Sequence, residues 1–228
     1  MDIGLSGAPQ RIRVWDLPTR LTHWMLVLMF VASWATAEWR LLDWHKRSGY
    51  AMLALVLFRI YWGFAGSSTA RFASFLRGPR AVREHFRELA ARHRARRLGH
   101  NPAGGWSATA ILATLILQVV LGLFAVDVDG LESGPLARWV SFGTGRAAAR
   151  VHESVFDALL VLIALHVAAV VFYLVWLREN LVRPMISGYV VPPPDTDLHM
   201  RAAPAWRAWL GALLASLVAG AVATGFRF

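Results

Sequence analysis

The chain of 228 residues contains no cysteine. This absence excludes disulfide bonds, iron–sulfur clusters held by thiolates, and thiolate zinc sites. It also excludes thioether attachment of a prosthetic group. Any such group must therefore be held by coordination and packing alone.

Charged residues are also few, at 17% of the chain, whereas hydrophobic residues make up 57% and the mean hydropathy is +0.45. A soluble domain of this size must present more polar surface to water. The composition therefore predicts an integral membrane protein with the lipid bilayer as its surroundings. The net charge of +10 does not indicate nucleic acid as a partner, because the arginines flank apolar segments and form no groove-reading motif.

Crossing the hydrocarbon core takes about 20 apolar residues in a helix. Four segments are long and apolar enough, namely residues 21–39, 45–66, 106–126 and 151–177. They predict an all-α membrane fold, a four-helix transmembrane bundle over residues 1–190. Residues 191–228 are expected to form a proline-rich linker and a fifth, alanine-rich and glycine-rich transmembrane helix at about 206–225.

The distribution of basic residues predicts the orientation. Residues 1–20, 67–105 and 178–205 carry 15 lysines and arginines, whereas residues 40–48 and 127–150 carry six. Loops rich in lysine and arginine stay in the cytoplasm, so the N-terminus is expected there. Residues 78–97 are expected to form either an amphipathic helix on the inner membrane surface or a solvated basic loop.

Four of the eight histidines lie in or at the ends of the predicted membrane helices. His152 and His166 are 14 residues apart, so they share one helix face and differ in depth by roughly 21 Å. His45 begins the second helix at the outer side, and His23 begins the first at the cytoplasmic side. Depth therefore pairs His45 with His152 and His23 with His166, as the axial ligands of two six-coordinate b-type haems require. The alternative is a set of interfacial histidines that form hydrogen bonds between helices.

Arg59 lies 14 residues after His45, on the same helix face and at the depth of the inner histidine pair. A guanidinium at this depth needs an anion, and a haem propionate is a suitable bidentate partner. The alternative is an arginine that extends to the lipid headgroups about two turns away.

Five sequence segments resemble the prokaryotic di-haem cytochrome b family, which includes cytochrome b561 and the cytochrome b subunits of nickel–iron hydrogenases. The segments are VWDLPTRLTHW (14–24), WHKRSGYAMLALVLFRIYWGFAGS (44–67), LGHNPAGGW (98–106), HESVFDALLVLIALH (152–166) and RENLVRPMISG (178–188). The resemblance covers roughly residues 11–188. It implies a four-helix bundle that binds two haem b groups in a bacterial cytoplasmic membrane. It also implies His23, His45, His152 and His166 as the iron ligands and Arg59 as a residue of the binding site.

The favoured interpretation is therefore an electron-transfer subunit between the quinone pool and a redox protein. That partner would be a c-type cytochrome or a subunit of dehydrogenase or hydrogenase type. A transporter that uses the membrane histidines for protons or a transition metal is the alternative, and it predicts ligands converging at one depth beside acidic residues. A quinone-linked oxidoreductase that needs no protein partner has the same sequence features.

The first testable prediction concerns orientation. A reporter fused near Arg92 should behave as cytoplasmic, and one fused near Ser133 as periplasmic, because arginines are concentrated in residues 67–105. Activity of the two fusions in intact cells measures this directly. The reverse pattern would invert the whole bundle and exchange the compartments that the two histidine pairs face.

Overall fold

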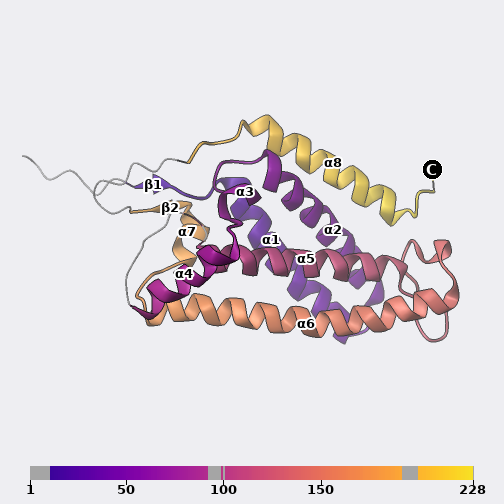
Figure 1. The fold of residues 1–228 in the computed structure, drawn as a ribbon. Helices are drawn as coiled ribbons and strands as arrows, with labels where there is room; N and C mark the ends of the chain where they lie inside the picture. The colour runs from indigo at the N-terminus through magenta and orange to yellow at the C-terminus, as the bar shows by residue number, and fades with distance from the viewer. Residues whose placement is uncertain (1–10, 92–98, 100, 192–199, 228) are drawn as a thin grey trace, which may run out of the picture.

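A computed structural model describes residues 11–91, 99, 101–191 and 200–227. It confirms the predicted helical class, and Figure 1 shows the arrangement of the helices. The five long helices are α1 (Leu17–Glu38), α2 (Leu42–Ala65), α5 (Pro102–Phe124), α6 (Phe142–Val175) and α8 (Ala205–Ala223). The short elements are β1 (Ile12–Arg13), α3 (Phe72–Phe75), α4 (Pro79–Ala90), the 3-10 turn η1 (Ala137–Trp139), α7 (Val182–Ser187) and β2 (Tyr189–Val190).

Four of the long helices, α2, α5, α6 and α8, are long and apolar enough to cross a membrane. Together they make the chain a multi-pass membrane protein, since each of them can span the hydrocarbon core alone. Helix α1 is not among the four, because polar residues such as Thr22 and His23 lower its hydropathy. It nevertheless has 22 residues and packs against α2, to which residues 39–41 connect it directly.

Side-chain caps determine where three of these helices begin. Asp16, Asn101 and Ser141 each accept a hydrogen bond from the backbone N–H three residues later, at 2.8, 2.6 and 3.2 Å. Such caps satisfy one of the amide groups that the first turn leaves without a helical partner. Pro18 and Pro102 occupy the first turns of α1 and α5, where a missing N–H carries no penalty.

Helix α6 begins nine residues earlier than the sequence-based bound of residue 151. The Ser141 cap starts it at Phe142, and the alanines at 147–149, which are strong helix formers, continue it. Its 34 residues make it about 51 Å long, which exceeds the roughly 30 Å hydrocarbon core. His152 therefore lies almost three turns inside α6, and the loop before the helix is correspondingly shorter.

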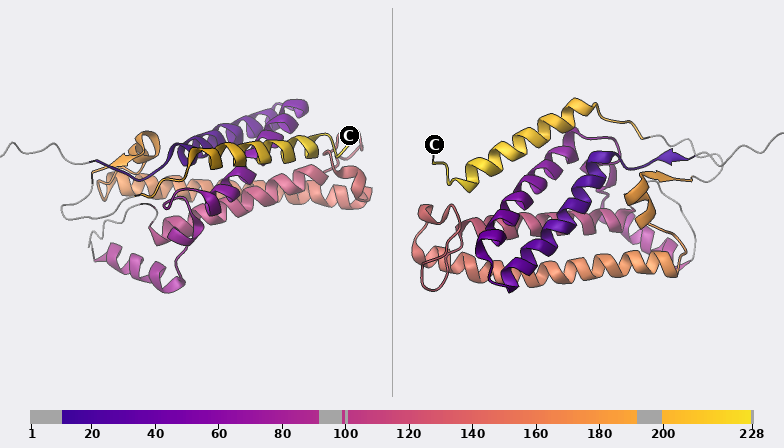
Figure 2. Two further views of the ribbon diagram at one scale, coloured as in Figure 1. Left: turned by 90° about the horizontal axis from the view of Figure 1, so that it is seen from above. Right: turned by 180° about the vertical axis from the view of Figure 1, so that it is seen from behind.

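Helix α2 is at the centre of the fold and packs against α1, α5 and α8, while α5 pairs with α6. Figure 1 and the right view of Figure 2 show α6 and α8 at opposite edges, with α1, α2 and α5 between them. Buried apolar side chains of α2, α5, α6 and α8 form the main core, which includes Met52, Val56, Leu115, Leu159 and Ala219.

One end of the bundle carries β1, β2, α3, α4 and α7, and we call it the inner end after the predicted orientation. Strand β1 pairs antiparallel with β2, so that Ile12 faces Val190, a contact that hydropathy did not predict. Of the two alternatives for residues 78–97, a helix is observed over Pro79–Ala90. Residues 92–98 and the proline run that begins at residue 192 lie outside the described residues.

Helix α8 packs on α2 through small residues. Gly211, Ala215 and Ala219 recur every four residues and are buried. A Cβ atom added at Gly211 would overlap the ring of Tyr61 on α2. This spacing lets the two helices approach closely, as small residues do at membrane helix interfaces.

The second prediction tests this packing. Gly211→Val should lower the stability of the purified protein by about 1–3 kcal/mol, because the added methyl groups overfill the contact with Tyr61. Gly220→Val is the matched control, since a Cβ atom there meets nothing within 4 Å. Thermal unfolding in detergent measures both variants. Equal stability of the two would show that α8 does not rely on this contact.

Candidate functional site

Two of the predicted site histidines meet near the outer end, opposite the inner end. His45 lies in the first turn of α2 and His152 lies on α6. Their ring centroids are 6.2 Å apart and the two ring planes are perpendicular, at 90°. The structure therefore brings together two side chains separated by 107 positions in the sequence.

Both of these rings are anchored to backbone carbonyls of neighbouring helices. Nδ1 of His45 lies 2.9 Å from the carbonyl oxygen of Ser33 on α1, and Nδ1 of His152 lies 2.9 Å from that of Gln118 on α5. A carbonyl oxygen only accepts, so each Nδ1 must carry the proton and donate it. The lone pair is consequently on Nε2 of each ring, the nitrogen through which an imidazole in this tautomer binds a metal.

Two glycines leave space around this pair. A Cβ atom added at Gly122 on α5 would lie 3.1 Å from Cε1 of His152, so the glycine lets that ring lie close against the helix. Gly49 is one turn after His45 and has nothing within 4 Å of its absent Cβ. By contrast, Gly63 accommodates the ring of Phe72 and serves helix packing instead.

The other predicted site residues gather toward the inner end. The ionisable groups in electrostatic contact with the ring of His23 on α1 include His166 on α6 and Arg59 on α2. The rings of His23 and Trp24 meet edge to face, at 5.0 Å between centroids. His23 therefore interacts electrostatically with the histidine and the arginine that the sequence places at its depth.

This inner group contains buried polar atoms with no hydrogen-bond partner among the described residues. They are Oγ1 of Thr19, Nε of Arg20, Nδ1 of His23 and Nη1 of Arg59. Leaving such groups unpaired is unfavourable, and both guanidinium groups can only donate. A donor-rich environment of this kind is suited to an anion such as a carboxylate.

Arg59 is held inside the protein at this position. Its guanidinium carbon lies 5.3 Å from the ring centre of Phe72, and the carboxylate of Asp16 contacts it electrostatically. That carboxylate already accepts hydrogen bonds from the backbone N–H of Thr19 and from the indole of Trp62, at 3.0 Å for the latter. Asp16 therefore offsets the charge of Arg59 without occupying all of its donors.

Aromatic side chains join α1 to α6 between the two histidine groups. Phe30 stacks on Phe156 with centroids 6.0 Å apart, and Trp34 packs against the same ring at 5.8 Å. Phe156 is one turn from His152, and Phe30 is two turns from His23. These rings fill the space between α1 and α6 at intermediate depth.

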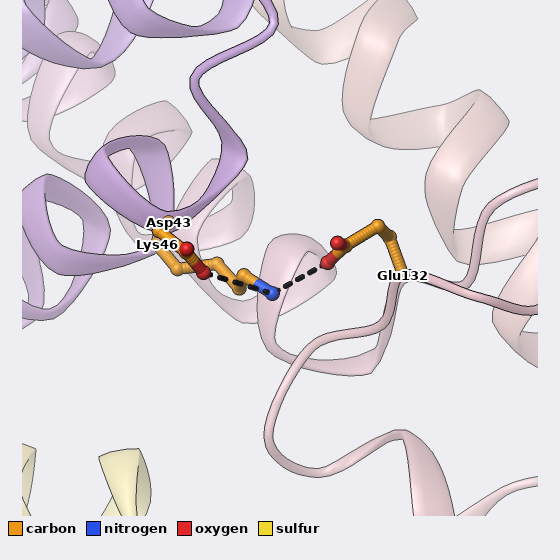
Figure 3. Close-up of polar contacts among 3 residues, drawn as sticks. All are labelled: Asp43, Lys46 and Glu132. Atoms are coloured by element: carbon orange, nitrogen blue, oxygen red, sulfur yellow. Dashed lines mark hydrogen bonds and ion pairs between the residues drawn. The ribbon is translucent and has the colours of Figure 1, made fainter.

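Lys46 follows His45, but its charge is already paired. Figure 3 shows its ammonium nitrogen bonded to Oε2 of Glu132 at 2.6 Å, with Asp43 at 4.0 Å. The pair joins the start of α2 to the loop between α5 and α6. Because it is partly exposed, its contribution to stability is small, about 0–1 kcal/mol.

Gln118 is not among the predicted site residues, although it is a polar residue inside the apolar run ILATLILQVVLGLF. Besides its carbonyl contact, its side-chain nitrogen lies 3.2 Å from Nε2 of His152. His85 is buried on α4, and its Nε2 lies 2.9 Å from the hydroxyl of Tyr173. His93, His100 and His199 lie outside the described residues.

These features define a class: a helical membrane protein with histidines between its helices at two depths, of which His45 and His152 meet ring to ring. A model of the family described as prokaryotic cytochrome b561 matches residues 14–188, and the chain belongs to that family. It is accordingly a membrane b-type cytochrome that transfers electrons, and the family implies haem b. Neither a curated protein nor a solved structure matched the chain.

The residues present fit a haem. Imidazole nitrogens bind first-row metals at about 2.0–2.1 Å, so two axial rings on one iron have centres about 6 Å apart. The separation of His45 and His152 is 6.2 Å. Toward the inner end, the unpaired donors of Arg20 and Arg59 lie in the same group as His23 and suit the carboxylates of a porphyrin.

Proposed function

We propose that the chain binds two haem b groups through paired histidines and carries electrons across the bacterial cytoplasmic membrane. His45 and His152 are the axial ligands of the outer haem, and His23 and His166 those of the inner haem. The observation that carries the proposal is the outer pair, whose ring centroids lie 6.2 Å apart and whose Nδ1 atoms both bond to backbone carbonyls, so that each lone pair is on Nε2.

The surrounding residues orient the outer imidazole rings and offset the charge of an inner haem propionate. Haem iron, when bound, supplies a reversible one-electron change. The carbonyls of Ser33 and Gln118 hold the outer rings in one tautomer, which makes each imidazole a stronger ligand. Arg59 binds a propionate of the inner haem, since its buried Nη1 has no other partner among the described residues.

The quinone pool is the proposed electron partner at one end and a redox protein at the other, either a c-type cytochrome or a dehydrogenase-type or hydrogenase-type subunit. The N-terminus is proposed to face the cytoplasm. The separation of the histidines into two groups favours this function over a transporter, which would gather its ligands at a single depth.

The third prediction is a haem stoichiometry. Pyridine haemochrome analysis should give about two haems per polypeptide, because each ligand pair holds one iron. His152→Ala and His23→Ala should each leave about one, since each removes one pair. His85→Gln is the control and should keep two, because His85 contacts Tyr173 on the inner part of α6 and belongs to neither pair. A ratio near one in the unaltered protein would remove one of the pairs from the proposal.

The fourth prediction concerns Arg59. Arg59→Leu leaves the inner propionate without its cation, and breaking a buried charge pair commonly costs about 3–5 kcal/mol. The inner haem should bind less tightly or shift in midpoint potential, with the outer haem nearly unchanged. A redox titration that resolves the two haems measures this effect.

Two further variants test whether the effect in that titration depends on the guanidinium group of Arg59. Arg59→Lys should rescue only partly, because an ammonium lacks the planar fork of a guanidinium. Arg207→Leu is a matched control, since Arg207 bonds the carbonyl of Ala65 at the same end of the bundle. If lysine restored the inner haem fully and leucine affected neither haem, Arg59 would be an arginine that extends to the lipid headgroups.

A further inference from the structure

The contact between His152 and α5 is unusual because the ring bonds to a carbonyl in the middle of a helix. The acceptor is the carbonyl oxygen of Gln118, at 2.9 Å from Nδ1. Gln118 lies well inside α5, which runs from Pro102 to Phe124. In an α-helix this oxygen also accepts the N–H four residues later, here that of Gly122. The imidazole therefore shares an acceptor that the helix already uses.

Gly122 makes this sharing possible. A Cβ atom at Gly122 would lie 3.1 Å from Cε1, 3.4 Å from Nδ1 and 3.9 Å from Nε2 of the His152 ring. The first of these distances is shorter than an ordinary carbon–carbon contact of about 3.5–4.0 Å. With a Cβ atom at 122, the ring would have to move away from α5 by a few tenths of an ångström, and the bond from Nδ1 to the Gln118 carbonyl would lengthen.

We infer that Gly122 is a positioning residue that sets the redox potential of the outer haem by letting His152 donate a hydrogen bond to the backbone of α5. This inference rests on the proposed function. A ligand imidazole that donates from Nδ1 is a stronger electron donor to its metal. Stronger donation favours the oxidised iron, which carries the greater positive charge, and so lowers the midpoint potential.

The role is confined to the outer site. Gly122 contacts His152, whereas His45 is held separately by the Ser33 carbonyl on α1. The inner pair lies about 21 Å away along α6, beyond the reach of a small displacement of one ring. The inner haem therefore serves as a reference within the same molecule.

The test is a redox titration of purified Gly122→Ala with both haems resolved, the outer haem being identified as the one lost in His152→Ala. Losing most of one hydrogen bond should shift the oxidation–reduction equilibrium of the outer haem about five-fold toward the reduced form. For a one-electron change this raises its midpoint potential by about 40 mV. The inner potential should not move. Alanine is the better helix former, so a change cannot come from a weaker α5.

Two further variants distinguish loss of the His152 hydrogen bond from steric crowding of the His152 ring. Gly122→Ser adds the same Cβ and also a hydroxyl that can donate to the carbonyl four residues earlier, that of Gln118. It competes directly with His152, so its upward shift should exceed that of alanine. Gly220→Ala, on α8 with open space around it, makes the same backbone change and should shift neither haem.

The outcomes are decisive in both directions. An upward shift confined to the outer haem, or loss of the outer haem alone, supports the inference. An unchanged outer potential in Gly122→Ala and Gly122→Ser, or equal shifts of both haems, overturns it. Failure of the proposed function looks different, because the unaltered protein would then contain fewer than two haems and His152→Ala would not remove one.

Discussion

The continuity of α6 is the constraint on which the rest of the structure depends. Backbone groups in the hydrocarbon core must be satisfied within the helix, so α6 cannot break between His152 and His166. Their spacing of 14 residues is therefore a fixed length of about 21 Å, with both side chains on one face. Every other element of the site is arranged around it: α1 and α2 bring His23 and His45 to the two levels, and aromatic rings separate these levels.

The two levels differ in their chemical environment. Toward the outer end, both imidazoles donate to backbone carbonyls, which are neutral acceptors supplied by α1 and α5. Toward the inner end, the ring of His23 lies near Arg59, and the donors of two arginines have no partner among the described residues. Ligand hydrogen bonds and nearby charge are the means by which a protein adjusts a haem. The histidines at the two levels therefore lie in two different electrostatic environments within one bundle.

The helical rise per residue and the bilayer thickness were sufficient to predict the long helices and the meeting of His45 with His152, because both are fixed lengths. The start of α6 at Phe142 was not predictable from hydropathy, since a serine cap and an alanine run determine it. The contact of Gly122 with His152 depends on the rotation of α5 about its own axis, which an apolar run does not specify. The pairing of β1 with β2 joins Ile12 to Val190, 178 positions apart, and Arg13 to Tyr189, 176 positions apart, so no local sequence pattern predicts it.

Helix α8 lies outside the matched family segment, and the geometry of α2 explains how it can be added without disturbing the site. His45, Gly49 and Arg59 fall on one face of α2, because their offsets of four and 14 residues are close to whole turns. Tyr61 is 16 residues after His45, which rotates it by about 160° to the opposite face. Gly211 of α8 meets Tyr61 on that far face. Helix α8 therefore shields the back of α2 from lipid and supports the scaffold, while the histidine face stays turned toward α1, α5 and α6.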